Sequence, residues 1–300
     1  RHWLFDNPRG IAPTLTGADN PVMTGRRFHT LFIDGAAQAL EAACWIAMLK
    51  ADRVVFAGDH KQLPPTVKCP EALHGGLGIT IPEQLAEKHP AAVRLLTMQY
   101  RMNERLMRFS SEWFYGGRLE AAPEVLGRSL AEELDEPMTW INVTADDEDD
   151  AGQGNEAFVG ATFGRINKKE AAATVAALKA YAEKVGRHRL AEERVSFGII
   201  SPYRAQVQYL RSLVKQDEYL RPLRRQITIN TVDAFQGSER DVIILSLVRS
   251  NAGGEIGFLS DLRRTNVAIS RARFKLIILG DAATLCRHKS YRRIYEYCAK

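Results

Sequence analysis

Short apolar runs alternate with amphipathic segments along most of the chain. Apolar runs bounded by turn residues predict buried strands, and apolar residues that recur every third or fourth position predict helices. We expect strands at 28–33, 53–57, 93–96, 138–143, 195–200, 227–230, 242–247 and 274–279. We expect helices at 38–50, 82–88 and 103–114, at 168–185, from the 201–204 turn to about 215, within 262–273, and at 282–297.

Strands that are apolar throughout and alternate with helices are typical of parallel sheets covered on both faces, so the predicted fold class is α/β. Three of the strands precede Gln99 and the others follow it, which indicates two α/β units in tandem. Asn167 is expected to cap the helix after it, with Glu170 at the capping-box position. Gly116 and Gly117 are expected to end a helix. Mostly irregular structure is expected at 1–27, 66–82 and 118–138.

Charge adds one feature to this pattern. The 300 residues carry a net charge of +5, and removing the five acidic residues of the run 146–150 leaves +10 on the rest. A basic body suits a polyanion such as single-stranded DNA or RNA, although solubility alone is the plain alternative. We expect the acidic run to be a solvated loop, because its spacing does not fit a calcium-binding loop.

Cysteine and hydrophobic patterns exclude further classes. Cys44, Cys69, Cys286 and Cys298 form no CxxC pair and have no histidine at zinc-finger spacing. This favours reduced thiols in a cytoplasmic protein. No apolar run approaches the roughly 20 residues that span a bilayer, so no membrane association is expected. The chain opens at Arg1 rather than methionine, so we expect a piece of a longer polypeptide, in which a missing targeting signal means little.

Five stretches at strand ends or turns carry the candidate chemistry. They are IDGAAQ (33–38), GDHKQLPP (58–65), QYRM (99–102), TVDAFQGSERDVIILSLVRS (231–250) and NVAISRAR (266–273). Asp34 ends a buried strand, where a carboxylate can hold the Mg²⁺ of a nucleoside triphosphate. Phosphoryl transfer also uses a residue that orients water and guanidinium groups that meet the developing charge, and the other stretches supply both.

In this order and spacing, the five stretches closely resemble superfamily 1 (1B) helicases of the nonsense-mediated-decay and immunoglobulin mu-binding-protein type. The resemblance covers about residues 14–283. It implies two RecA-like domains that hold ATP between them, with a single strand of DNA or RNA crossing both. It assigns 1–97 to the C-terminal part of a truncated first domain and 98–300 to the second domain. The implied activity is that of an ATP-dependent helicase.

By resemblance, Asp34 holds Mg²⁺ and Gln62 lies near the γ-phosphate of ATP. The resemblance further implies that Arg101 reaches the γ-phosphate and that Arg271 is an arginine finger supplied by the second domain. It places Tyr100 near the adenine, and Gly237 and Glu239 near the ribose and phosphates. This hypothesis requires the residues of the first unit to face those of the second across a shared gap. Most of these residues also have a structural alternative: a helix cap for Asp34, a loop hydrogen bond for Gln62, packing for Tyr100, surface ion pairs for Arg101 and Arg271, and pairing with Arg240 or solvent for Glu239. Arg273 is expected to be such a surface partner.

Five further residues are candidates for binding nucleic acid: Thr16, Ser201, Tyr203, Arg204 and Thr231. Hydroxyl groups, arginine and backbone amides hold phosphates without reading bases, and aromatic rings stack on exposed bases. For Tyr203, packing beneath the turn is an equal alternative.

Two departures from the family pattern bear on activity. The 300 residues contain no G-x-x-x-x-G-K-[ST] loop to cradle phosphates. Gly35 stands where the family has the glutamate that polarises the attacking water, and glycine cannot act as a general base. We therefore predict negligible ATP hydrolysis by this chain. The alternative function is a non-catalytic module that binds nucleic acid or a partner protein. An unrelated P-loop kinase or GTPase is disfavoured, because it has no need for the arginines of the second unit.

Overall fold

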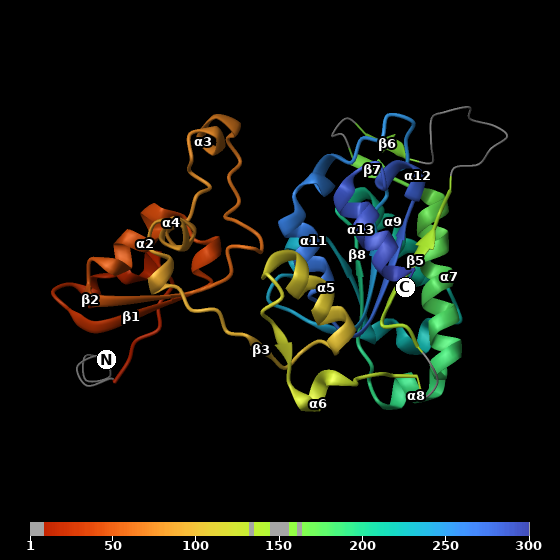
Figure 1. Cartoon of the computed structure of the whole chain (residues 1–300), viewed down its shortest axis with the longest axis horizontal. Helices are drawn as coiled ribbons and strands as arrows, with labels where there is room; N and C mark the ends of the chain where they lie inside the picture. The colour runs from red at the N-terminus through yellow and green to blue at the C-terminus, as the bar shows by residue number, and fades with distance from the viewer. Residues whose placement is uncertain (1–8, 132–134, 145–155, 161–163, 300) are drawn as a thin grey trace. The chain divides into compact units, whose positions relative to one another are not determined.

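The computed structural model describes residues 9–131, 135–144, 156–160 and 164–299 (Figure 1). The chain divides into two compact units, Arg1–Leu95 and Leu96–Lys300. The acidic run 146–150 lies outside the described residues, so its expected loop structure stays a prediction. Among the described residues, no helix combines the length and the apolar character needed to cross a membrane.

The first unit is built on two parallel strands, β1 (Phe28–Asp34) and β2 (Ala51–Ala57), joined through α2 (Glu41–Met48). Ile33, Ala36 and Cys44 form its small buried core. The remaining elements are short: η1 (Thr16–Asp19), η2 (Pro21–Met23), η3 (Ala36–Gln38), α3 (Pro70–His74), α4 (Ile81–Lys88) and η4 (Pro90–Ala92). Helix α3 lies in the stretch 66–82, which the sequence pattern predicted to be irregular.

The strand predicted at 93–96 is wrong. Val93 and Leu96 are exposed, so the apolar run has no sheet to pack into. The chain becomes extended only at β3 (Met98–Gln99), which pairs in parallel with β4 (Glu120–Ala121) in the second unit. The stretch 118–138 is also less irregular than predicted, because it holds β4 and the short helix α6 (Pro123–Leu126).

The second unit contains a five-stranded sheet in the order β5-β11-β10-β8-β9. All its pairings are parallel, which confirms the predicted α/β class with parallel sheets. The strands are β5 (Met138–Asn142), β8 (Phe197–Ile200), β9 (Ile227–Asn230), β10 (Arg240–Ser246) and β11 (Ala272–Gly280). Each of the central strands β8 and β10 is almost wholly buried, as expected of strands covered on both faces.

Helices cover both faces of this sheet (Figure 1). On one face, α7 (Lys168–Val185) and α9 (Arg204–Gln216) pack on alternate residues of β10, including Val242 and Ile244. On the other lie α5 (Glu104–Phe114), α11 (Leu262–Ile269) and α13 (Lys289–Cys298). The remaining elements are β6 (Ala157–Val159), β7 (Gly164–Ile166), α8 (Arg187–Glu192), η5 (Arg221–Gln226), α10 (Val232–Phe235), η6 (Gly257–Ser260) and α12 (Ala282–Leu285). The segment predicted as one helix at 282–297 is therefore two helices.

The predicted cap of α7 is half right. The Asn167 side chain accepts a hydrogen bond from the Glu170 amide at 2.9 Å, as expected of an N-cap. Glu170 does not complete a capping box, because the Asn167 amide donates instead to the Gln206 side chain. The Glu170 carboxylate points into the unit and accepts hydrogen bonds from Ser246, the last residue of β10, and from Val248 just after it, as described below.

Candidate functional site

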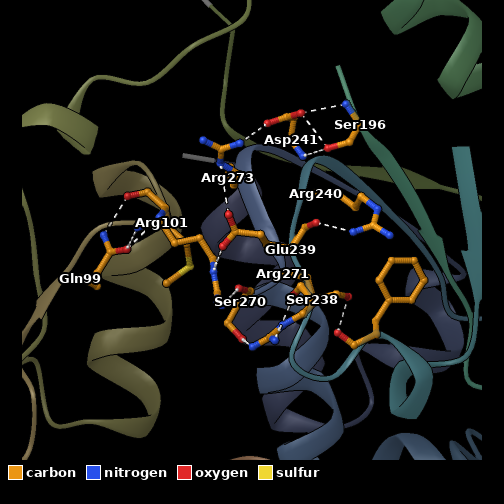
Figure 2. Close-up of polar contacts among 12 residues, drawn as sticks. Gln99, Arg101, Ser196, Ser238, Glu239, Arg240, Asp241, Ser270, Arg271 and Arg273 are labelled. Atoms are coloured by element: carbon orange, nitrogen blue, oxygen red, sulfur yellow. Dashed lines mark hydrogen bonds and ion pairs between the residues drawn. The ribbon is translucent and has the colours of Figure 1, made fainter. Parts of the chain in front are cut away.

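The amino-terminal edge of the five-stranded sheet carries a cluster of arginines and carboxylates (Figure 2). Glu239 directly precedes β10, and Arg271 directly precedes β11. Because β10 and β11 pair in parallel, with Arg240 opposite Ala272, these neighbouring residues meet at one edge. The turn after β3 brings in Arg101, so three segments distant in sequence meet here.

Arg101 is held by one carboxylate and one carbonyl. Its Nε donates to the Glu239 carboxylate at 2.6 Å, and its terminal nitrogen donates to the Ser270 carbonyl at 3.0 Å. The two side chains are 34% and 44% exposed, so water screens the ion pair and it contributes little to stability. The alternative predicted for Arg101, a surface ion pair, is thus present, and it leaves the guanidinium at the surface of the unit. The Glu239 carboxylate pairs with Arg101, whereas the alternative predicted for it was Arg240 or solvent.

Arg273 extends the cluster along the edge. It contacts Glu239 at 3.7 Å and pairs with Asp241 at 2.9 Å. The other oxygen of Asp241 accepts hydrogen bonds from the amide and the hydroxyl of Ser196. Arg273 therefore has the ion-pair role that the sequence predicted for it, and it ties the starts of β8, β10 and β11 together.

Arg271, the predicted arginine finger, is placed differently. It is 3% exposed, and it donates to the carbonyls of Val267 at 3.0 Å and Ser238 at 3.1 Å. Arg271 is buried, so it does not have the exposed position that its alternative, a surface ion pair, requires. In this arrangement Arg271 fixes the Gly237–Ser238 turn, in which Gly237 has a φ of +75°. Its role toward a phosphate stays a prediction.

The turn that presents Arg101 is organised by Gln99. Its side-chain oxygen accepts from the amides of Arg101 and Met102, and its amide nitrogen donates to the Met102 carbonyl. Tyr100 lies at the exposed tip of this turn. The packed position offered as its alternative is therefore absent within this unit, and the ring offers a free face for stacking.

The predicted residues of the first unit follow its two strands. Asp34 ends β1 opposite Ala57, so the loop with Gln62 begins beside it. The Asp34 carboxylate is exposed and accepts from the Gly35 amide at 2.9 Å. It does not cap η3, which has no side-chain cap. Gln62 donates to Asp59 at 2.8 Å, the loop bond offered as its alternative. The requirement that these residues face the arginine cluster stays a prediction.

Gly35 has a φ of +65°, a backbone conformation that residues other than glycine rarely adopt. A Cβ built on it would meet nothing within 4 Å. Space is therefore available for a larger residue, and the cost of one there is backbone strain rather than a clash.

The predicted nucleic-acid residues of the second unit gather at the opposite, carboxyl-terminal edge of the sheet. Ser201 and Tyr203 follow β8, Thr231 follows β9, and Arg204 is the exposed first residue of α9. Ser201 is fully buried and Tyr203 is 5% exposed, so neither offers an accessible surface. Packing beneath the turn, the alternative for Tyr203, is what the structure shows. Thr16, in the first unit, is exposed at the start of η1.

Sequence reasoning missed a buried polar network at this carboxyl edge. Arg249 and Glu156 pair at 2.8 Å with side chains only 3% and 6% exposed. Glu156 also accepts from the Ser250 amide and from Arg165. The signal was present in the sequence as charged residues flanking the apolar run of β10, but their partner lies about ninety residues away in the chain.

The chain leaves β10 through a strained turn. Val248 has a φ of +71°, and the Arg249 amide donates to the Leu247 carbonyl at 2.8 Å, which closes a γ-turn of the rare positive-φ kind. Glu170 holds this turn by accepting from the Val248 amide at 2.8 Å and from the Ser246 hydroxyl. Burial raises the pKa of Glu170 to about 8, against the lowering effect of these hydrogen bonds. Strain in a β-branched residue persists only where its surroundings enforce it, and this network does so.

The residues present fit a magnesium nucleotide in their chemistry. Arg101 and Arg273 are partly exposed at the amino edge, and guanidinium groups match phosphate oxygens in geometry. The exposed carboxylate of Asp34 is a hard oxygen ligand. Protein sites commonly hold Mg²⁺ through one or two carboxylates together with phosphate oxygens. Among the described residues, no group of three or more His, Cys, Asp or Glu side chains is placed to hold a metal ion.

Two family models match the chain, both described as AAA domain, at residues 77–283 and 4–70. The chain belongs to this AAA-domain family of superfamily 1 helicases. It is 36% identical to the DNA-binding protein SMUBP-2 of Mesocricetus auratus, over 96% of this chain and 28% of that protein. It is 37% identical to the DNA polymerase alpha-associated DNA helicase A of Saccharomyces cerevisiae, over 90% of this chain and 41% of that protein.

The chain is also 36% identical to the regulator of nonsense transcripts 1 of Dictyostelium discoideum, over 96% of this chain and 21% of that protein. It thus spans less than half of the length of the curated relatives it matches. Among solved structures, it is similar to the helicase nonstructural protein 10 of an arterivirus, with 13% identity and a TM-score of 0.38 over 89% of this chain and 50% of that one. The predicted family is confirmed, and the predicted enzyme lineage agrees with it.

Proposed function

We propose that this chain is a portion of an ATP-dependent superfamily 1 helicase that couples ATP between two RecA-like domains to movement along single-stranded DNA or RNA. In this proposal the amino edge of the large sheet contacts the nucleotide, and the carboxyl edge of the same sheet contacts the single-stranded nucleic acid. The proposed domains are 1–97 and 98–300, and the proposed cofactors are ATP and Mg²⁺. ATP supplies the phosphoryl group and Mg²⁺ screens its charge.

The observation that carries the proposal is the half-exposed cluster of Arg101, Glu239 and Arg273. Three separate segments converge there, and the contacts of Arg101 and Arg273 with Glu239 are exposed enough to open. An incoming phosphate can therefore take the place of Glu239 as the partner of Arg101. A guanidinium committed to a buried pair would have no such freedom.

We further propose that this chain hydrolyses ATP negligibly. It contains no phosphate-binding loop, and Gly35 offers no carboxylate to polarise water. Gly35 also supports the second candidate function, a module that holds single strands or a partner protein without catalysis. A cytoplasmic location remains a prediction.

The affinity of the chain for single-stranded nucleic acid, measured with and without nucleotide, distinguishes these two functions. We would titrate labelled single-stranded DNA and RNA with the chain by fluorescence anisotropy, alone and with a non-hydrolysable ATP analogue and Mg²⁺. The helicase proposal expects the analogue to change strand affinity, and expects Arg101→Ala to remove the change. Arg108→Ala is the matched control, because Arg108 is an exposed arginine of the nearby α5 whose ion pair is with Glu104 of the same helix.

The outcomes are distinct. Strand binding that ignores the analogue favours the non-catalytic module. Absence of strand binding overturns the helicase proposal and the strand-holding form of the module, and it leaves only the form that binds a partner protein. Robust ATP hydrolysis, stimulated by single strands and abolished by Arg271→Ala, overturns the proposed hydrolytic deficiency.

A further inference from the structure

Phe258 is an exposed aromatic residue on the carboxyl edge of the large sheet. The residue is 60% exposed, although burying its ring would add hydrophobic stabilisation. It borders a hollow of about 110 Å³ that is also lined by Pro202, Val232, Asp233 and Arg264. Enclosed small-molecule pockets usually measure about 300–1,000 Å³, so this hollow suits a single planar group resting on the surface.

The ring is held in place from below. Tyr203 lies beneath it, with the ring centroids 5.8 Å apart, and the Tyr203 hydroxyl accepts from the buried Arg249 at 3.3 Å. Gly257 has a φ of +51°, and a Cβ there would lie 2.4 Å from the Arg249 guanidinium. Only glycine lets the backbone approach this closely, and the approach delivers Phe258 to the surface. A ring fixed in advance loses little entropy on binding.

The hollow lies between two neighbouring strand ends. Pro202 follows β8, while Val232 and Asp233 follow β9, and these two strands pair directly. Ser201 and Thr231, two of the residues expected to bind nucleic acid, are the immediate chain neighbours of this lining. The Phe258 ring therefore lies beside the path proposed for the single-stranded nucleic acid.

The charges around the hollow favour a base over a phosphate. The Arg264 guanidinium lies 5.9 Å from the ring centroid, within the range of a cation–π contact, and it pairs with Asp261 at 3.4 Å. The exposed carboxylate of Asp233 repels a phosphate placed in the hollow itself. An aromatic face flanked by a guanidinium is the arrangement on which unstacked bases rest.

We propose that Phe258 is a stacking platform for one base of a bound single strand, with Arg264 beside it toward the sugar–phosphate backbone. Tyr203, which the sequence indicated as the aromatic contact, supports the platform instead. Because every base presents a π face, this contact is insensitive to sequence. The inference rests on the proposed strand binding and adds the residue that meets a base.

Anisotropy titrations with a short oligothymidylate, an oligouridylate and an abasic oligonucleotide of equal length test this. Phe258→Ala should weaken binding of both base-bearing strands about tenfold and leave the abasic strand unchanged. Phe258→Trp should retain affinity, and its fluorescence should be quenched when a base stacks on it. The dependence of affinity on salt should not change in either variant, because no phosphate contact is lost.

Phe158→Ala is the matched control. Phe158 is 62% exposed and also carries a guanidinium over its ring, that of Arg165 at 4.2 Å, but it lies on the β6–β7 hairpin and does not line the hollow. The Phe158→Ala variant should bind all three oligonucleotides with the affinity of the wild type. Equal losses in the two alanine variants, or an equal loss on the abasic strand, overturn the platform. Wild-type binding that Phe258→Ala leaves intact also overturns it, whereas a wild type that binds none of the strands overturns the proposed function.

Discussion

The two edges of the five-stranded sheet hold their charges in different ways. At the amino edge, Arg101 and Glu239 pair with both side chains more than one-third exposed. At the carboxyl edge, Arg249 and Glu156 pair almost entirely out of water. A screened pair exchanges partners at little cost, while a buried pair that loses one member leaves an uncompensated charge.

This difference predicts different roles for the two edges of the sheet. The ion pair at the amino edge can open and re-form at little cost, which suits a charged ligand that binds and is released. At the carboxyl edge, buried charges, the strained Val248 and the fixed Tyr203 build a rigid base for exposed groups such as Phe258. We expect substitutions at the carboxyl edge to act mainly on stability, and substitutions at the amino edge to act mainly on ligand response.

The largest expected effect is on the buried pair. Glu156→Ala leaves Arg249 and Arg165 without their shared carboxylate and removes the acceptor of the Ser250 amide. We expect the free energy of unfolding to fall by about 3–5 kcal/mol. Urea denaturation followed by circular dichroism measures it. A loss below about 1 kcal/mol would show that the two edges are alike.

Arg271 is the exception that sharpens the comparison, since it lies at the amino edge yet is buried. Arg271→Lys cannot replace its several bonds, so the carbonyls of Val267 and Ser238 lose their donors. We expect a loss of about 2–3 kcal/mol in the free energy of unfolding. Arg273→Lys is the matched control, because Arg273 is partly exposed, and it should cost under about 1 kcal/mol. Equal costs for the two variants would contradict the structural role of Arg271.

Glu170 gives the carboxyl edge a pH dependence. Burial raises its pKa in the folded state from 4.5 to about 8. Between these values the folded chain holds a proton that the unfolded chain has released, so stability falls as pH rises from about 4.5 to about 8. The slope from this group is at most about 1.4 kcal/mol per pH unit.

Thermal unfolding across this pH window, for the wild type and Glu170→Gln, isolates the contribution of Glu170. The glutamine cannot release a proton, and it keeps the acceptor for Ser246 and Val248. Its stability should therefore fall less steeply with pH than that of the wild type. Parallel curves would show that Glu170 is ionised throughout and that the network pairs it more strongly than its burial suggests.

The sequence predicted the strands of the large sheet well because each is a continuous apolar run between turn residues. The prediction at 93–96 failed because apolar content alone does not supply a neighbouring strand. Short elements such as α8 and the β6–β7 hairpin went unnoticed, since each is too short for a repeat of apolar positions to stand out.

The motif positions could be predicted, but the partners of their side chains could not. Glu170 occupies a capping-box position by local spacing, yet its carboxylate bonds to Ser246, which is distant in sequence. Tyr203 and Phe258 are both aromatic residues after strand ends, and only the packing shows which one is exposed. Long-range pairing and burial are properties of the assembled fold, so a reading of local sequence pattern does not contain them.

The smallest expected effect tests whether the amino edge is as loosely held as its exposure indicates. A double-mutant cycle of Glu239→Gln and Arg101→Met measures the coupling between two groups that lie 2.6 Å apart. We expect about 0.2–1 kcal/mol in the free energy of unfolding at low salt, and less at high salt, because water and ions screen the pair. A coupling above about 2 kcal/mol that persists in high salt would mean that Arg101 is committed to Glu239. An incoming phosphate could not then displace Glu239, and the contrast between the two edges would fail.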